Sequence, residues 1–324
     1  IYEGNYHDER AWDELERLAD ALDEWAKVAA LFTRNIPEDV GGDDSQFTLL
    51  RRLARATERL QGESASRRHW ELLLERFADD SEAIEHLERI YTALSAHEEL
   101  VGLLQHQATL DSVNDAQRKL IFNRVASLLE DVLDQPERAT EAYERALELD
   151  PNELSTYTAL ERLYRAASQW QAVVGLLRQQ LDILTEIEQQ HATLHRLAKL
   201  LDEQCGDVEG AVECYRTILS ENDAHAEALP AAAALLERIA AEAKAEHAKQ
   251  RRALADVLEP IHVARGGHAE LAALLRIRLA DAEDRLERRR MCGHQRAKAK
   301  GGQGHMNHAT QSDPEIRRHR RPPP

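Results

Sequence analysis

The sequence predicts an all-α protein, an α-solenoid in which antiparallel helix hairpins stack one after another. Three observations support this fold class. Leu, Ala, Glu and Arg dominate the 324 residues, with only 14 Gly and 9 Pro, a composition typical of helical proteins. Apolar residues recur at steps of three and four, the spacing of one helix face. Several landmarks also return at intervals of about 72 residues, which indicates a stacked repeat.

The stretch Glu137–Trp170 shows the unit of this repeat. Its first half places one apolar face on a helix, with small residues beside one aromatic: Ala139, Ala142, Tyr143, Ala146 and Leu147. Pro151 then ends that helix, because the residue before a proline is pushed out of the α region. A second helix follows, and Trp170 opens the next apolar run. Since the intervening turns are short, we expect antiparallel neighbours.

These residues resemble the tetratricopeptide repeat (TPR). The pattern is small, aromatic, small, proline, and then large residues of the next helix: Ala139, Tyr143, Ala146, Pro151, Tyr157, Leu160 and Tyr164. The resemblance covers roughly residues 10 to 280 and is less close in the other units, so we describe the chain as TPR-like. It implies a right-handed α-solenoid whose inner helices line a concave face. It also implies a non-enzymatic scaffold for protein–protein interaction, which binds a peptide or protein partner on that face.

Independent landmarks keep a superrepeat of about 72 residues, which holds two helix hairpins. Leu15, Leu87 and Leu160 each begin the motif Leu-Glu-Arg. Three further sets recur at the same offsets: Trp25, His97 and Trp170; Gly62, Asp134 and Gly206; Trp70, Tyr143 and Tyr215. If Trp25 and Trp170 are buried between hairpins, truncating either to Ala should cost about 3–5 kcal/mol.

The periodicity predicts twelve helices and then a change of pattern. We expect helices near 10–22, 25–34, 46–61, 64–77, 81–94, 97–109, 115–133, 136–149, 153–167, 170–184, 187–205 and 208–220. An extra hairpin is expected at about 225–256, because the Leu-Glu-Arg motif at Leu236 leads into an Ala-rich segment without the usual aromatic. Pro260 should start a helix or kink one.

Charge divides the chain into an acidic array, 1–287, and a basic tail, 288–324. The net charge is −17, of which the tail contributes +8 and the array −25. We expect the tail to be disordered, because it is rich in Gly and poor in apolar residues. An acidic array disfavours nucleic-acid binding. The alternative function is therefore a regulatory or nucleic-acid-associated protein that uses its tail, where the run 317–321 is basic but lacks interleaved aromatic residues.

The candidate binding residues are three arginines at one position of the superrepeat. Arg17, Arg89 and Arg162 each stand two residues after the leucine of the Leu-Glu-Arg motif, a position that tends to face the groove in TPR-like helices. On one interpretation they form a ladder that clamps carboxylates of an acidic or C-terminal peptide. On the other, which is favoured, each pairs with Glu residues of an adjacent helix. Further groove candidates are Arg165, Thr158, Asn123, His195 and Lys199.

No catalytic centre, cofactor site or metal site is predicted. The carboxylate pairs lie on solvated faces and loops rather than in a cleft. Three cysteines, Cys205, Cys214 and Cys292, have no disulfide or metal spacing, and no apolar run reaches the ~18 residues of a membrane span. Because the chain begins with Ile1, we expect its N-terminus to be incomplete. This end therefore does not identify the cellular compartment, although a cytoplasmic location is favoured.

Overall fold

A computed structural model describes residues 9–35, 44–242, 244–282 and 286. The described residues form helices and turns and no strand, so the predicted all-α fold is confirmed. The chain divides into two compact units, Ile1–Ile183 and Leu184–Pro324. The tail expected at 288–324 lies outside the described residues, and the division into array and tail stays a prediction. None of the described helices is long and apolar enough to cross a membrane.

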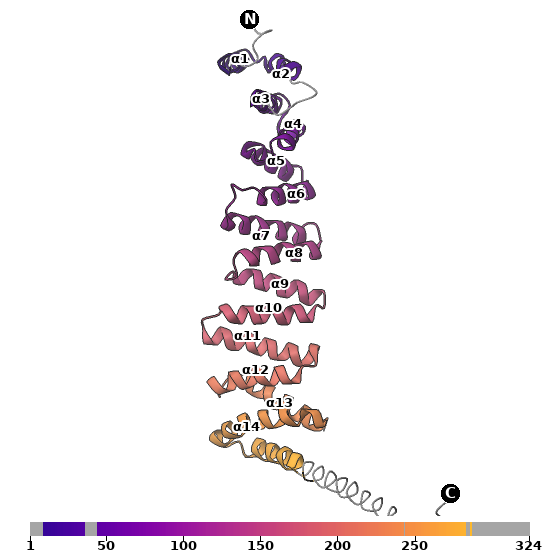
Figure 1. The fold of residues 1–324 in the computed structure, drawn as a ribbon, viewed down its shortest axis with the longest axis vertical. Helices are drawn as coiled ribbons and strands as arrows, with labels where there is room; N and C mark the ends of the chain where they lie inside the picture. The colour runs from indigo at the N-terminus through magenta and orange to yellow at the C-terminus, as the bar shows by residue number, and fades with distance from the viewer. Residues whose placement is uncertain (1–8, 36–43, 243, 283–285, 287–324) are drawn as a thin grey trace, which may run out of the picture. The chain divides into compact units, whose positions relative to one another are not determined.

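The first unit is a series of helices in which each packs against the next (Figure 1). They are α1 (Glu9–Leu22), α2 (Trp25–Asn35), α3 (Asp44–Gln61), α4 (Glu63–Arg76), α5 (Ser81–Ala93), α6 (His97–Ala108), α7 (Asp115–Asp131), α8 (Pro136–Leu149), α9 (Leu154–Ala166) and α10 (Trp170–Ile183). Each begins and ends within two residues of its predicted bounds. The sequence places their ends well because apolar faces stop at recognisable caps, such as the capping box of Asn114 and Gln117 at α7.

The second unit contains α11 (Ile187–Leu200), which runs into a π-helical turn (Leu201–Cys205), then α12 (Val208–Glu221) and α13 (Ala228–Ala241). A 3₁₀ turn (Ala245–His247) leads into α14 (Ala248–Arg265), and residues 268–282 form a terminal helix. The extra hairpin expected at about 225–256 falls on α13 and α14. Pro260 lies inside α14 and does not start a helix.

Turn conformations follow the predicted superrepeat. Gly62, Asp134 and Gly206 all have positive φ, at 89°, 52° and 65°. A second equivalent set, Asp23, Ser95 and Ser168, has φ of 54°, 54° and 55°. Only glycine adopts this region without a steric penalty. The recurrence of one unusual backbone conformation at one spacing confirms that the superrepeat is structural.

The Gly206→Ala substitution should destabilise the protein by about 1–2 kcal/mol, the cost of placing an L-residue in the left-handed region. No atom lies within 4 Å of the Cβ that would be added, so the whole cost comes from the backbone. Urea unfolding followed by circular dichroism measures it. The reverse change at the equivalent position, Asp134→Gly, should be neutral or stabilising by up to about 1 kcal/mol. Equal effects of the two substitutions would contradict this account.

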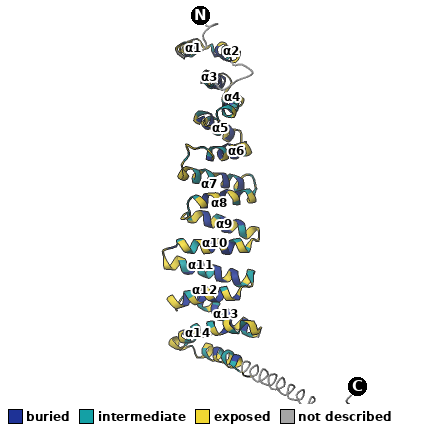
Figure 2. Ribbon diagram, viewed as in Figure 1, coloured by how far each residue is buried: buried dark blue, intermediate teal, exposed yellow. Residues whose placement is uncertain are grey.

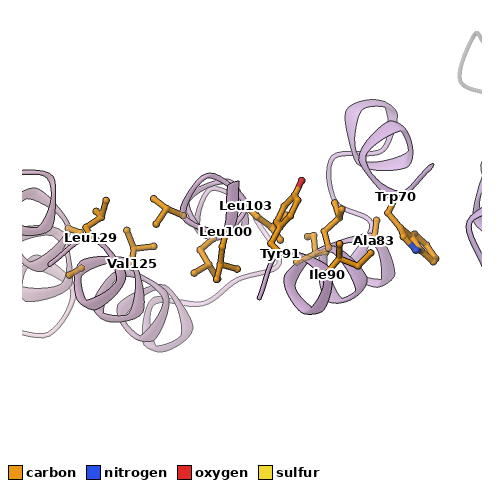
Figure 3. Close-up of a cluster of buried hydrophobic side chains, with 14 of the residues drawn as sticks. Trp70, Ala83, Ile90, Tyr91, Leu100, Leu103, Val125 and Leu129 are labelled. Atoms are coloured by element: carbon orange, nitrogen blue, oxygen red, sulfur yellow. The ribbon is translucent and has the colours of Figure 1, made fainter. Parts of the chain in front are cut away.

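Buried apolar residues fill the space between successive helices of the first unit (Figure 2). The largest cluster runs from α3 to α9, and Figure 3 shows part of it. Trp70 is 0 % exposed and stacks on His86 with 4.2 Å between ring centroids. Trp25 is buried and its Nε1 donates to Asp20 (3.0 Å), whereas Trp170 is only half-buried. The burial on which the predicted cost of truncation depends is therefore present at Trp25 and incomplete at Trp170, so Trp170→Ala should cost less than Trp25→Ala.

Stability should fall as the pH drops below about 6.5, the ordinary pKa of histidine, partly because of His69. Burial lowers the pKa of His69, and its Nδ1 has no hydrogen-bond partner among the described residues. The unfolded state then binds the proton more tightly, so the stability present above pH 6.5 is lost as the pH falls toward the depressed pKa. His69→Gln should lose less stability than the wild type between pH 7 and pH 5 in urea titrations. Identical losses would exclude His69 as a contributor.

Candidate partner-binding surface

Side chains of successive odd-numbered helices meet in the first unit. We call this row the ion-pair ladder, and it comprises Arg52–Asp13, Arg59–Asp20, Arg55–Glu82, Arg89–Glu58, Arg124–Glu88 and Arg162–Glu130. Every pair joins two of the helices α1, α3, α5, α7 and α9 that are neighbours in this odd-numbered series. The ladder therefore marks one continuous face of the unit. The even-numbered helices contribute neither the arginines nor the acids of these six pairs.

The three predicted arginines lie on this series but differ in their partners. Arg162 donates from Nη2 to Glu130 of α7 over 2.9 Å. Arg89 approaches two acids outside its own helix, at 3.1 Å from Glu63 and 3.9 Å from Glu58. Arg17 contacts Glu14, one turn earlier in its own helix. Two of the arginines thus reach a neighbouring helix and the third does not.

The remaining groove candidates are divided between the units. On α9, Arg165 donates to Glu161 (2.8 Å) and Thr158 donates to the carbonyl of Leu154 (3.2 Å). On α7, the Oδ1 of Asn123 is buried without a hydrogen-bond partner among the described residues. His195 and Lys199 lie on α11 in the second unit. Arg162, Arg165 and Thr158 are thus brought together on α9, and their binding role stays a prediction.

His195 and Lys199 each face an acid of the second unit. His195 Nε2 lies 3.7 Å from Glu227, and Lys199 lies 3.9 Å from Glu203. Burial lowers the pKa of His195, although the charge of Glu227 opposes that shift. A neutral imidazole is therefore favoured at neutral pH, so His195 is suited to hydrogen bonding rather than to pairing with a partner's carboxylate.

At its α7–α9 rung, the ladder is open to solvent on the arginine side. The side chain of Arg162 is 62 % exposed, whereas that of Glu130 is 12 % exposed. Ion pairs of this kind contribute about 0–1 kcal/mol each. A guanidinium has five N–H donors, so Arg162 keeps donors that can bind a second carboxylate. The geometry allows recognition of acidic groups without breaking the intramolecular pair.

The sequence did not predict a pair of cavities on another side of the first unit. One, of about 530 Å³, lies among α8, α9 and α10, and the other, of about 390 Å³, adjoins it by sharing Glu144 and Tyr164. We call them together the acidic cleft, after their acidic lining residues: Glu137, Glu141, Glu144, Glu148 and Asp182. The sequence feature that could have predicted this cleft is the spacing of four glutamates along α8. Other helices of the chain are also rich in acids, so this spacing did not stand out.

No group of three or more His, Cys, Asp and Glu side chains in the described ranges could hold a metal ion. Cys214 is buried, Cys205 is half-buried, and neither forms a disulfide. Cys292 and the histidines of the tail lie outside the described residues. The ladder and the acidic cleft are thus two surface features of the first unit that involve no metal-binding group.

A sequence-family comparison matches residues 156–190 to the tetratricopeptide repeat. This range covers α9 and α10, so the resemblance seen in the sequence is confirmed there. The ladder joins odd-numbered helices of the first unit, of which α9 lies in the matched range. No curated protein matches the chain by sequence.

Solved structures with a similar fold include several TPR proteins. The structure of Naa15/Naa10 bound to HypK-THB matches at 18% identity and a TM-score of 0.40, over 72% of this chain and 36% of that one. YrrB, described as a TPR protein with an unusual peptide-binding site, matches at 15% identity and 0.31, over 63% and 98%. A thermophilic TPR protein of Thermus thermophilus matches at 16% and 0.27, over 59% and 98%. The chain thus spans about a third of the first of these proteins.

Proposed function

We propose that this TPR-like chain is a non-enzymatic protein-interaction scaffold, which binds a protein or peptide partner along the face of the ion-pair ladder. We infer that this face is the concave face expected of the solenoid. The observation that supports the proposal most directly is the ladder itself, because exposed arginines recur on successive odd-numbered helices. Periodic donors of this kind suit an extended partner better than a small molecule.

The chemistry of the ladder favours an acidic partner. Arg89 and Arg162 are held by carboxylates on neighbouring helices, so their side chains are already ordered before a partner arrives. Binding then costs less side-chain entropy than it would for free arginines. A partner carboxylate could accept from the donors that remain, in the bidentate geometry that guanidinium groups favour.

The test is a selection of random 12-residue peptides on the immobilised protein, followed by affinity measurements. We expect Asp, Glu or a free C-terminal carboxylate to be enriched in one class of selected peptides. Replacing Arg17, Arg89 and Arg162 together with Ala should weaken binding of that class at least tenfold, as measured by fluorescence anisotropy. Melting curves of each variant separate lost binding from lost folding.

A matched control removes three arginines of similar exposure from even-numbered helices: Arg68, Arg138 and Arg216. This control changes the net charge equally but leaves the ladder intact, so affinity should change less than twofold. Equal weakening in both triple variants would show a general charge effect and would overturn the assignment of the ladder. Loss of stability with unchanged affinity would favour a purely structural role for the arginines.

A further inference from the structure

The acidic cleft is a second binding surface, independent of the ladder. We propose that it binds a basic segment of a partner protein, with one large apolar side chain of that segment in the cleft and two or more Lys or Arg residues on its acidic walls. The proposal rests on the shape of the cleft, on its unbalanced charge and on a comparison with the equivalent region of the preceding superrepeat.

The floor of the cleft is apolar and largely preformed. Leu147, Tyr157, Leu160 and Leu176 are all buried and form a cluster of their own, separate from the main core. Tyr164 and Ile183 pack against it and are only half-buried. The opening above them, about 530 Å³, is within the range of ligand-binding sites. It can accommodate a large apolar side chain, and burying that side chain would favour binding.

The walls of the cleft carry acids and no lysine or arginine. Along α8, four exposed glutamates stand at steps of four, three and four, which places them on one side of the helix: Glu137, Glu141, Glu144 and Glu148. Asp182 faces them from α10. None of these five has an ion-pair partner among the described residues. Like charges at this helical spacing repel each other, so a cationic ligand would relieve that repulsion.

The arginines of α8 are engaged on its other sides. Arg138 pairs with Glu98 of α6 (3.0 Å), and Arg145 lies over the ring of Phe122 of α7 (5.7 Å to the centroid). Neither lines the cleft. The helix thus separates its charges by side, with the positive charges toward its neighbours and the negative charges toward the cleft.

Tyr164 keeps one of the cleft carboxylates in place. Its hydroxyl donates to Glu144, and burial together with this hydrogen bond raises the pKa of Tyr164. Burial, together with the charge of Asp182, also raises the pKa of Tyr157. Both phenols therefore remain protonated at neutral pH and add no charge of their own. Glu144 is held at the junction of the two cavities with acceptor capacity left for a partner's ammonium or guanidinium group.

The preceding superrepeat shows how the same arrangement is neutralised. Seventy-three residues upstream, Tyr91 donates to Glu71 as Tyr164 does to Glu144. There, however, Arg67 pairs with Glu71 (2.6 Å) and Arg68 pairs with Glu75 (3.2 Å).

The residues equivalent to these two arginines are Thr140 and Glu141. The chain thus supplies its own counterions in one superrepeat and omits them in the next. This difference is what points to an external cation at the cleft.

The length of the acidic stripe limits the ligand. From Glu137 to Glu148 the helix rises about 16 Å at 1.5 Å per residue. This length matches about five residues of extended chain or about three turns of helix. A short segment with two to four basic residues around one Leu, Ile, Phe or Trp fits these dimensions.

The test uses the full chain and a random 12-residue peptide library displayed on phage. Peptides selected on the wild-type protein are counter-selected on the variant Thr140→Arg/Glu141→Arg, which introduces the counterions found upstream. We expect the peptides lost in this step to combine Lys or Arg with one large apolar residue. Their affinity, measured by fluorescence anisotropy, should weaken at least tenfold in the variant and also with increasing salt.

Two further variants exclude trivial explanations. Ser220→Arg/Asp223→Arg makes the same change in net charge on exposed residues of the second unit and should alter affinity less than twofold. Glu144→Gln/Glu148→Gln removes charge with little change in shape, and should weaken binding even if the arginine variant proves unstable. Replacing Arg17, Arg89 and Arg162 with Ala should leave the affinity for these basic peptides unchanged. The proposal for the cleft and the proposal for the ladder are therefore tested independently.

Three results would overturn the proposal. The first is that the selected peptides are neutral or acidic. The second is that basic peptides bind wild-type and Glu144→Gln/Glu148→Gln proteins equally. The third is that carbodiimide joins Lys298 or Lys300 to Glu141 or Glu148 in the free protein, which would make the chain's own tail the occupant.

Discussion

Replacing Arg251 with Met should destabilise the second unit by about 3–5 kcal/mol, which is the usual cost of leaving one member of a buried ion pair alone. Arg251 of α14 and Asp281 of the terminal helix are 4 % and 7 % exposed. The guanidinium donates from Nε to Asp281 (2.9 Å) and from Nη1 to the carbonyls of Lys244 (2.9 Å) and Ile239 (3.3 Å). One side chain therefore joins α13, the turn before α14, and the terminal helix.

The measurement is urea unfolding, combined with hydrogen exchange of peptides from α13, α14 and residues 268–282. Exchange in the terminal helix should accelerate most, because Asp281 would lose its ion pair with Arg251. The double variant Arg251→Met/Asp281→Leu should recover part of the loss, since it buries no unpaired charge. Recovery should be incomplete, because the carbonyls of Lys244 and Ile239 lose a donor. A loss below about 1 kcal/mol in the single variant would show that the pair is hydrated.

Truncating Trp70 to Ala should destabilise the first unit by about 3–5 kcal/mol, because it removes a fully buried indole from a core cluster that runs from α3 to α9. Trp70 packs between α3 and α5, with its ring stacked on His86. The space it vacates is bordered by helices on both sides, which limits how far they can move inward to fill it.

Trp70→Phe provides the control. The indole Nε1 is buried and has no hydrogen-bond partner among the described residues, so replacing the indole with a phenyl ring loses volume but no hydrogen bond. We expect its cost to be no more than about 1.5 kcal/mol. Circular dichroism should follow the unfolding, since both changes remove a fluorophore. A similar cost for the two substitutions would contradict this account, because a phenyl ring keeps most of the filled volume and can still stack on His86.

The sequence predicted the helices well because each of their ends has a local cause. Pro136 begins α8 at the position that tolerates a proline, and Asp150-Pro151 ends it. Positive φ at Asp134 could be anticipated from its alignment with Gly62 and Gly206. Such signals lie within a few residues of the feature they determine, so spacing alone identifies them.

Features that depend on two helices were harder to predict. The sequence placed Arg17, Arg89 and Arg162 at one repeat position, yet their acids are arranged differently. Arg17 contacts its own helix, Arg89 contacts α4 and α3, and Arg162 contacts α7. The burial of Trp70 and the partial exposure of Trp170 likewise depend on the packing of adjacent hairpins. The acidic cleft was missed because an unpaired glutamate and a paired one are identical in sequence.

The ion-pair ladder has a consequence for how the first unit folds. Its hydrogen-bonded pairs join residues only 27 to 39 apart in the chain, so no step requires closure of a long loop. Low contact order of this kind favours rapid folding, and structure can begin at any hairpin and spread to its neighbours. Unfolding of such an array begins by fraying at its ends. A partner that binds across several pairs of the ladder would slow this fraying and would lengthen the lifetime of each hairpin that it covers.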